Sequence, residues 1–349
     1  MHMADALLSP AVGVSLWAGT AAVGGYASKK LKVQINDRTI PLMGVLGAFI
    51  FAAQMINFTI PGTGSSGHLG GGMILAILLG PHAAFLTMAS VLTVQALFFA
   101  DGGLLALGCN IWNLGVYPCY LVYPLLYRPL AGEGRSPGRI LIASVLSVVI
   151  ALQLGAFSVV LETLLSGRSE LPFGAFVLLM QPIHLAIGIV EGFVTAGIIG
   201  YVAAARPEIL ESVATERPIG AGVPLAKVLT VFALLAVLTG GAFSWFASTH
   251  PDGLEWAIER VTGRGELSEA EHGVAAVLRG LQEKTAFLPD YGFKADAAEP
   301  APEDSAPAWP GIEAGTSAAG VTGAAIVLVL VGLIGLGIRS AGRKTGSAP

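Results

Sequence analysis

The chain has 349 residues, of which 54% are hydrophobic and only 12% are charged, and its mean hydropathy is +0.73. A soluble globular domain carries about 25% charged residues, so this composition excludes an ordinary water-soluble protein and indicates a polytopic membrane protein. The net charge of −4 favours no partner by itself, and no nucleic-acid partner is expected. The two cysteines share one apolar segment, which argues against a disulfide framework.

Apolar runs predict nine membrane-crossing helices, and the predicted fold class is all-α. A spanning helix needs about 20 mostly apolar residues. The run 70–80 is short for a span at about 1.5 Å per residue, but we count it because of the charge pattern described next. In chain order the predicted spans are 11–28, 40–58, 70–80, 82–99, 104–128, 139–165, 174–204, 224–246 and 315–338.

Lysine and arginine positions predict the orientation. With the N-terminus outside, the inner loops and their edges hold Lys29, Lys30, Lys32, Arg38, Arg128, Arg135, Arg139, Arg206, Arg217, Lys227, Arg339, Arg343 and Lys344. Segment 247–314 then lies outside and is rich in acidic residues. This arrangement follows the positive-inside rule, and omitting the crossing at 70–80 would reverse every later loop.

The spans and charges together predict four parts of the chain. Residues 1–205 form a seven-helix membrane domain, and 206–223 form a cytoplasmic linker. Residues 224–338 form a two-helix unit whose outer loop is 247–314, and 339–349 form a cytoplasmic tail. The N-terminus is expected outside and the C-terminus inside, in a bacterial or archaeal cytoplasmic membrane.

The first two residues, Met1 and His2, offer three nitrogen ligands to one metal ion. The Met1 amine and the His2 main-chain nitrogen close a five-membered chelate ring, and the same main-chain nitrogen and His2 Nδ1 close a six-membered one. His68, in a glycine-rich loop on the same predicted side, can supply a fourth nitrogen. Four nitrogens in a plane favour Ni²⁺ or Cu²⁺, whereas a tetrahedral zinc site would use cysteines or carboxylates. Each histidine alone is weak evidence, but the predicted topology places both outside.

Four ordered motifs carry a resemblance to a known family. They are "MHMADALLSP", "GTGSSGHLGGG", "ADGGLLALGCNIWNLG" and "QPIHLAIGIVEG". Residues 1 to about 205 resemble the nickel/cobalt-binding membrane subunit of energy-coupling-factor (ECF) transporters, the NikM/CbiM family. The resemblance implies seven helices and a metal site made by Met1, His2 and His68. Ala6 stands where the family more often has glycine.

The second half is similar to the small companion subunit of the same transporters, the NikN/CbiN-like protein with the PDGLE motif. The stretch "HPDGLEWAIER" carries this similarity. The resemblance therefore implies a fusion that captures Ni²⁺, or alternatively Co²⁺, with high affinity as the transported substrate of an ATP-driven importer. No phosphate-binding loop of the G-x-x-x-x-G-K-[ST] type is present in the sequence. The expected partners are a transmembrane coupling (T) subunit and separate ABC-type ATPase subunits, within the lipid bilayer.

Polar residues within the predicted spans are further candidates. Gln181, His184 and Glu191 share one face of the span 174–204, where they would form either a proton or metal path or hydrogen bonds between helices. We prefer the second interpretation, because one uptake step per ion needs no relay. Candidates for contacts to the metal ligands or for gating are Ser66, Asn110 and Asp101, although Asp101 is also explained as a turn residue.

Two other functions compete with metal capture. A metalloenzyme would need an open coordination position and a nearby acid or base, which four nitrogens in a plane do not leave, so no catalytic residue is predicted. A secondary transporter would be expected to carry inverted repeats and a midplane ion site, and no internal repeat is visible. A requirement for separate ATPase chains distinguishes the importer from the secondary transporter.

Overall fold

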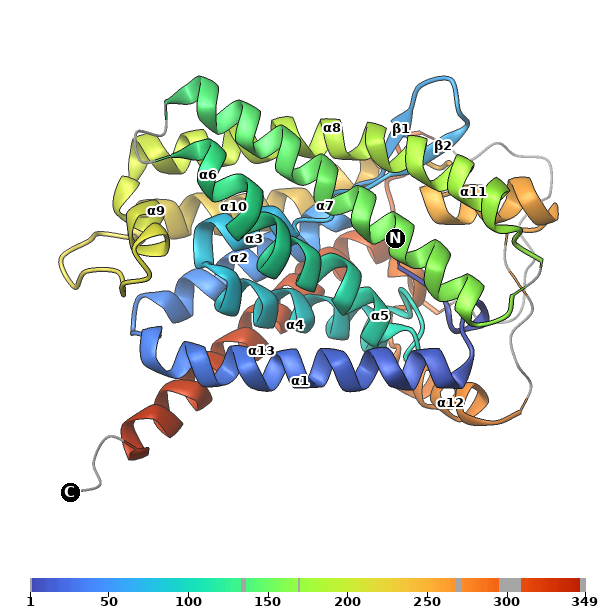
Figure 1. Cartoon of the computed structure of the whole chain (residues 1–349), viewed down its shortest axis with the longest axis horizontal. Helices are drawn as coiled ribbons and strands as arrows, with labels where there is room; N and C mark the ends of the chain where they lie inside the picture. The colour runs from blue at the N-terminus through green and yellow to red at the C-terminus, as the bar shows by residue number, and fades with distance from the viewer. Residues whose placement is uncertain are drawn as a thin grey trace.

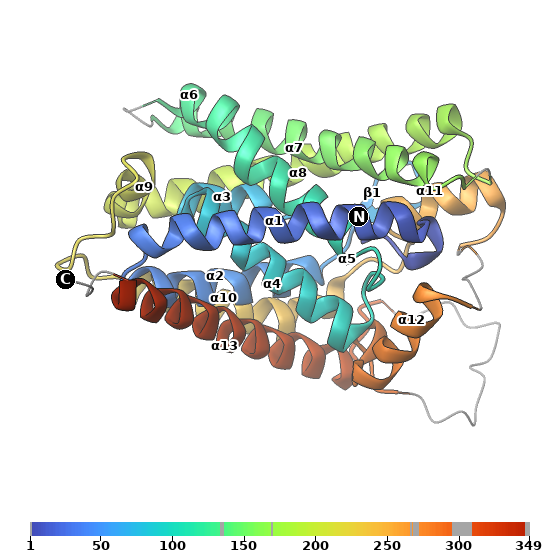
Figure 2. The same ribbon diagram turned by 60° about the horizontal axis from the view of Figure 1, so that its bottom comes forward.

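The computed structural model describes residues 2–132, 136–168, 170–265, 267, 272–294 and 309–345. The long helices run side by side along the longest axis of the molecule (Figures 1 and 2). The β1–β2 pair (Phe58–Ile60 and Ser65–Gly67), α11 (Gly253–Thr262) and α12 (Val274–Thr285) gather at one end of this axis, and α9 (Pro207–Ala214) lies at the other end (Figure 1). This confirms the prediction of an all-α membrane protein.

The predicted spans correspond to helices with these bounds: α1 (Pro10–Gln34), α2 (Thr39–Gln54), α3 (Gly72–Leu79), α4 (Pro81–Phe99), α5 (Leu107–Ile111), η2 (Trp112–Tyr127), α6 (Arg128–Ala131), α7 (Pro137–Leu165), α8 (Phe173–Ala205), α10 (Ala226–Gly241) and α13 (Ala314–Thr345). Four helices in the described part are long and apolar enough to cross a membrane, namely α4, α7, α8 and the stretch Ala314–Arg343 of α13. The apolar helices α2 and α10 are shorter.

Local sequence explains where α1 and α7 begin. The Ser9 hydroxyl accepts a hydrogen bond from the Val12 N–H and Pro10 opens α1, while Ser136 and Pro137 form the same arrangement before α7. The predicted span 104–128 is less regular, because η2 is a wide π-type helix that contains Pro118 and Pro124. Proline lacks an N–H and cannot complete the ordinary helical hydrogen bonds.

The predicted span 70–80 is a helix of only 8 residues, α3, which is about 12 Å long. It is preceded by a two-stranded antiparallel pair, β1 (Phe58–Ile60) and β2 (Ser65–Gly67), and by chain without regular secondary structure at 68–71. Our expectation of a helix beginning at residue 70 is therefore corrected by two residues. Non-helical backbone at membrane depth must be hydrogen-bonded by protein groups, and α2 and α8 provide these groups here, as described below.

The two helices of the C-terminal half, α10 and α13, pack against α2 of the first half. Close approach of α10 to α13 depends on Gly240 and Gly320, because a Cβ atom at Gly320 would lie 2.2 Å from the Gly240 carbonyl oxygen. Between these helices lie η3 (Phe243–Phe246), α11 (Gly253–Thr262), α12 (Val274–Thr285) and η4 (Pro289–Tyr291). The segment 206–223 begins with α9 (Pro207–Ala214), a short amphipathic helix.

Candidate metal centre

The amino-terminal segment is folded back into the bundle. Met3 and Leu7 are almost fully buried, at 0% and 1% exposure. The side chain of Asn110 on α5 holds the main chain of Met3, because its Oδ1 accepts from the Met3 N–H at 2.9 Å and its Nδ2 donates to the Met3 carbonyl at 3.3 Å. Gly103 N–H also donates to this carbonyl. Met3, the residue after His2, is therefore held at both its N–H and its carbonyl group.

The ring of His2 lies among groups from both halves of the chain. His2 Nδ1 is 2.9 Å from Asp101 Oδ1, and Asp101 Oδ2 accepts a hydrogen bond of 2.5 Å from the Tyr291 hydroxyl. Burial opposes the charge on Asp101, but His2 and Tyr291 outweigh it and lower the pKa of Asp101 to about 2. The other ring nitrogen of His2, Nε2, is buried and has no hydrogen-bond partner within the described residues.

The ring of His68 stacks on that of His2. The two ring centroids are 5.1 Å apart and the planes differ by 14°. Burial lowers the pKa of His68 to about 3, so the imidazole is neutral at physiological pH. Its Nδ1 lies 3.0 Å from the Leu69 carbonyl. In the tautomer that donates this hydrogen bond, the lone pair of the ring is on Nε2, as a metal ligand requires.

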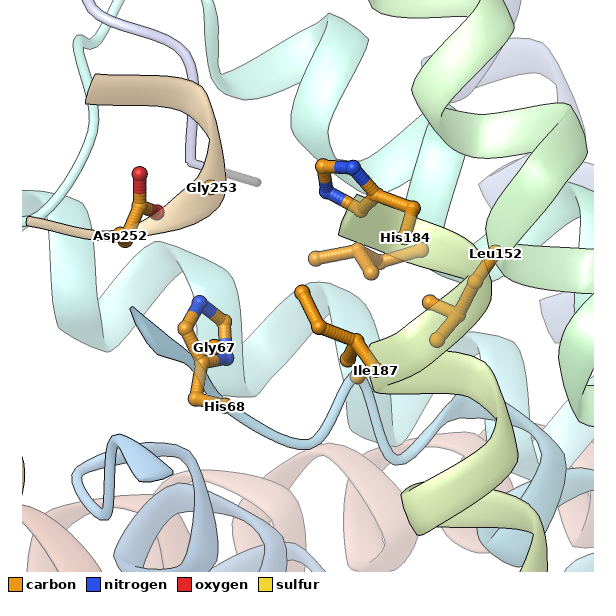
Figure 3. Close-up of a pocket in the computed structure, with 9 residues that line it drawn as sticks. Gly67, His68, Leu152, His184, Ile187, Asp252 and Gly253 are labelled. Atoms are coloured by element: carbon orange, nitrogen blue, oxygen red, sulfur yellow. The ribbon is translucent and has the colours of Figure 1, made fainter. Parts of the chain in front are cut away.

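A cavity of about 10 Å³, roughly the volume of one water molecule, adjoins His68 (Figure 3). It is lined by His184 and Ile187 from α8 and by Asp252 at the start of α11. His184 is buried, and its Nδ1 lies 2.8 Å from the Met180 carbonyl one turn earlier. A larger cavity, of about 370 Å³, reaches both His2 and His68, and the residues that line it include the acidic residues Asp5, Asp101, Asp252, Glu255 and Asp290.

The outer segment of the C-terminal half rests on the loop that carries His68. Ser66 N–H donates to the Pro251 carbonyl and Ser66 Oγ donates to the His250 carbonyl, both at 2.8 Å. Asp252 then caps α11 by accepting from two main-chain N–H groups of that helix. From the sequence we expect segment 247–314 to dock near residues 1–10 and 59–69, and the contact of this turn with Ser66 lies in the second of these ranges. The motif itself does not specify which residue it contacts.

The polar residues of α8 fall into two groups. Each oxygen of Glu191 accepts a main-chain hydrogen bond, from Gly70 at 2.6 Å and from Gly71 at 2.8 Å. Gln181 instead points to α7, where it and Gln153 exchange side-chain-to-carbonyl hydrogen bonds. The three residues that the sequence placed on one face therefore do not form one continuous polar path.

Six of the nine candidate residues lie around the two stacked rings: His2, His68, Ser66, Asp101, Asn110 and His184. The Glu191 side chain contacts the main chain of the loop after His68, and Gln181 lies apart. Met1 is outside the described residues. The described residues contain no group of three or more His, Cys, Asp or Glu side chains arranged to hold a metal ion.

Comparison with known proteins places these features in a family. Residues 2–209 match the model of the CbiM family, described as a cobalt uptake substrate-specific transmembrane region, and residues 226–340 match the PDGLE domain. The chain is 33% identical to a putative fused nickel transport protein of Archaeoglobus fulgidus, over 95% of this chain and 96% of that protein. It is 30% identical to a fused nickel transport protein of Rhodobacter capsulatus, over 99% and 100% of the two chains.

A solved structure supports the same relationship. The crystal structure of a truncated transition metal transporter superposes with a TM-score of 0.52 and 28% identity, over 59% of this chain and 99% of that one. The chain thus belongs to the CbiM family of nickel and cobalt transport proteins, fused at its C-terminus to a PDGLE domain.

Proposed function

We propose that this protein captures Ni²⁺ on the outer side of the membrane for an ATP-driven importer of the ECF type. The observation that carries the proposal is the stacking of His2 on His68, two residues that are far apart in sequence, with ring centroids 5.1 Å apart. A buried amino-terminal segment brings His2 to this position.

In the proposed site, four nitrogens surround the metal in a plane. They come from the Met1 amine, the His2 main chain, His2 Nδ1 and the His68 ring. Planar coordination by nitrogen suits Ni²⁺, and the carboxylates nearby would balance the positive charge of the complex. Co²⁺ is the alternative substrate, because the relatives are named for nickel transport while the family model is described for cobalt uptake.

Loading the metal would require His2 to rotate. In the structure His2 Nδ1 faces Asp101, whereas chelation through Nδ1 needs this nitrogen to face the metal. A turn about the Cβ–Cγ bond would move Nδ1 away from Asp101, and a further shift of the ring would bring Nε2–H to the carboxylate. Histidines that bind metals generally donate their second ring N–H to a carboxylate or carbonyl group. We therefore assign Asp101 the role of orienting His2 in the loaded state.

The topology completes the proposal. The N-terminus and the segment 247–314 lie outside, and the C-terminus lies inside, in agreement with the distribution of Lys and Arg. Seven crossings precede residue 205 if the non-helical chain at 68–71 together with α3 makes the third. The sequence has no phosphate-binding loop, so the energy for uptake would come from separate ATPase subunits through a coupling subunit.

Blocking the amino terminus tests the site directly. A tag placed before Met1 removes the free amine and displaces the main-chain nitrogen of His2, so nickel retention after purification should be lost. A tag placed after residue 349 should leave nickel retention intact. Equal retention by the two versions would overturn the proposed site.

Secondary transport is the competing function. Nickel accumulation in cells that express this chain alone, and in cells that also express the ATPase and coupling subunits, distinguishes the two. Accumulation that is independent of the ATPase chains would contradict the importer.

A further inference from the structure

The carboxylate of Glu191 holds the main chain just beyond His68. Glu191 lies on α8 and is 1% exposed. Its Oε2 accepts a hydrogen bond of 2.6 Å from the Gly70 N–H, and its Oε1 accepts one of 2.8 Å from the Gly71 N–H. Together with Leu69, these two glycines connect His68 to Gly72, the first residue of α3. Gly71 has a φ of +77°, a conformation that other residues rarely adopt.

The opposite side of this connection is held by α2. Gln54 Nε2 donates to the Gly70 carbonyl at 2.9 Å, and Gln54 Oε1 in turn accepts from Gln95 Nε2 on α4 at 2.9 Å. Both glutamines are buried, at 4% and 0% exposure. A continuous series of hydrogen bonds therefore runs from α4 through α2 and the main chain at Gly70 to Glu191 on α8.

The same face of α8 follows the loop over two further turns. Ile187 packs so closely against Gly67 that a Cβ atom there would lie 2.4 Å from Ile187 Cδ1. One turn before it, His184 lines the small cavity beside His68 (Figure 3). The main chain on both sides of His68 is thus fixed to α8, by packing at Gly67 and by hydrogen bonds at Gly70 and Gly71.

We propose that Glu191 is a positioning residue that sets the orientation of the His68 ring toward His2. This inference rests on the proposed nickel site, in which His68 supplies the fourth nitrogen. A carboxylate suits this role because both oxygens accept hydrogen bonds. Glutamine has nearly the same shape but offers one acceptor and one donor, so its amide group would face one of the two N–H groups without bonding it. The loop would then lose one of its two hydrogen bonds to α8, and the His68 ring would no longer be held in the plane of the four proposed nitrogen ligands.

The experiment uses the full-length protein in detergent, with nickel affinity measured by competition with a chromophoric chelator. Glu191→Gln should weaken nickel binding about 10- to 100-fold, the usual effect of removing a group that orients a metal ligand. The absorption of planar nickel should weaken in parallel. Glu162→Gln is the matched control, because Glu162 is also buried but accepts from the side chains of Asn113 and Ser158 rather than from the main chain at Gly70 and Gly71. It should bind nickel within about twofold of the unmodified protein.

A double-mutant cycle separates positioning from general destabilisation. In a His68→Ala background, Glu191→Gln should have almost no further effect, because the ligand it positions is absent. An equal loss in both backgrounds, or no loss in the native background, would overturn the inference alone. Should His68→Ala itself leave the affinity unchanged, the proposed nickel site would fail and this inference with it.

A second variant keeps the test decisive if Glu191→Gln does not fold. Gln54→Met removes the donor to the Gly70 carbonyl while preserving the length of the side chain. Nickel binding should weaken about 2- to 10-fold, the equivalent of one net hydrogen bond, and again only when His68 is present. The same loss in the His68→Ala background would refute the role of this connection.

Discussion

Asn110 is the residue whose replacement gives the most direct measure of how the amino terminus is held. Its side chain makes two hydrogen bonds to Met3, one residue after the proposed ligand His2. Asn110→Leu preserves the approximate volume but removes both bonds. The Met3 carbonyl would keep its hydrogen bond from Gly103, whereas the buried Met3 N–H would lose the Asn110 acceptor.

The size of the effect follows from this asymmetry. An unsatisfied buried donor costs about 1–3 kcal/mol, and each 1.4 kcal/mol changes an equilibrium constant about tenfold. If metal binding requires the docked amino terminus, the nickel affinity should fall by about 5- to 150-fold. The upper limit applies if the full free-energy cost of the unsatisfied N–H opposes the docking of residues 2–8. The docked state that binds the metal is then less populated, and the apparent affinity falls in proportion.

Asn113→Leu is the matched control. Asn113 lies one turn further along the same helical region, is equally buried, and donates to Glu162 on α7 instead of contacting the amino terminus. Both proteins would be purified in detergent, and their nickel affinity and thermal unfolding would be measured together. The reasoning is refuted if Asn110→Leu binds nickel within twofold of the unmodified chain, or if Asn113→Leu loses as much affinity.

Four further predictions follow from the same geometry. A chain truncated near residue 223 should still bind nickel with similar affinity, because the outer segment supplies no proposed ligand. Cells that express it should accumulate little nickel, since the Pro251–Ser66 contact that links the segment to the site is lost. A truncated chain that loses nickel binding, or that transports nickel normally, would refute this prediction. Protein purified from cells given both ions should contain more nickel than cobalt, and an excess of cobalt measured by mass spectrometry would reverse the choice of metal. Asp101→Asn should weaken nickel binding about 10- to 100-fold by replacing the charged acceptor of His2 with a neutral amide, and unchanged binding in a competition assay would exclude this role. Because the pKa of His68 falls from 6.5 to about 3 on folding, the unfolded chain binds a proton below pH 6.5 that the folded chain excludes. Without bound metal, the protein should therefore lose thermal stability as the pH falls from about 7 to about 5, and His68→Gln should lose less. Equal losses of stability in the two proteins would contradict the lowered pKa of His68.

The membrane class, the approximate helix positions and the candidate residues His2 and His68 could be predicted from the sequence. These properties depend on residues that are close together in the sequence, because an apolar run long enough to span a bilayer can be recognised from the sequence alone. The family motifs likewise identified His2 and His68. Ser9 and Ser136, each followed by proline, mark the beginnings of α1 and α7 for the same local reason.

How these elements meet follows from the tertiary structure. The third predicted span is reduced to the 8 residues of α3 and the chain at 68–71 is not helical, since Glu191 and Gln54 supply hydrogen bonds that a helix would otherwise make internally. The tertiary structure also places the PDGLE turn on Ser66. Such contacts join residues 16 to 184 positions apart, and a linear pattern of hydrophobicity carries no information about which distant polar group completes a buried hydrogen bond.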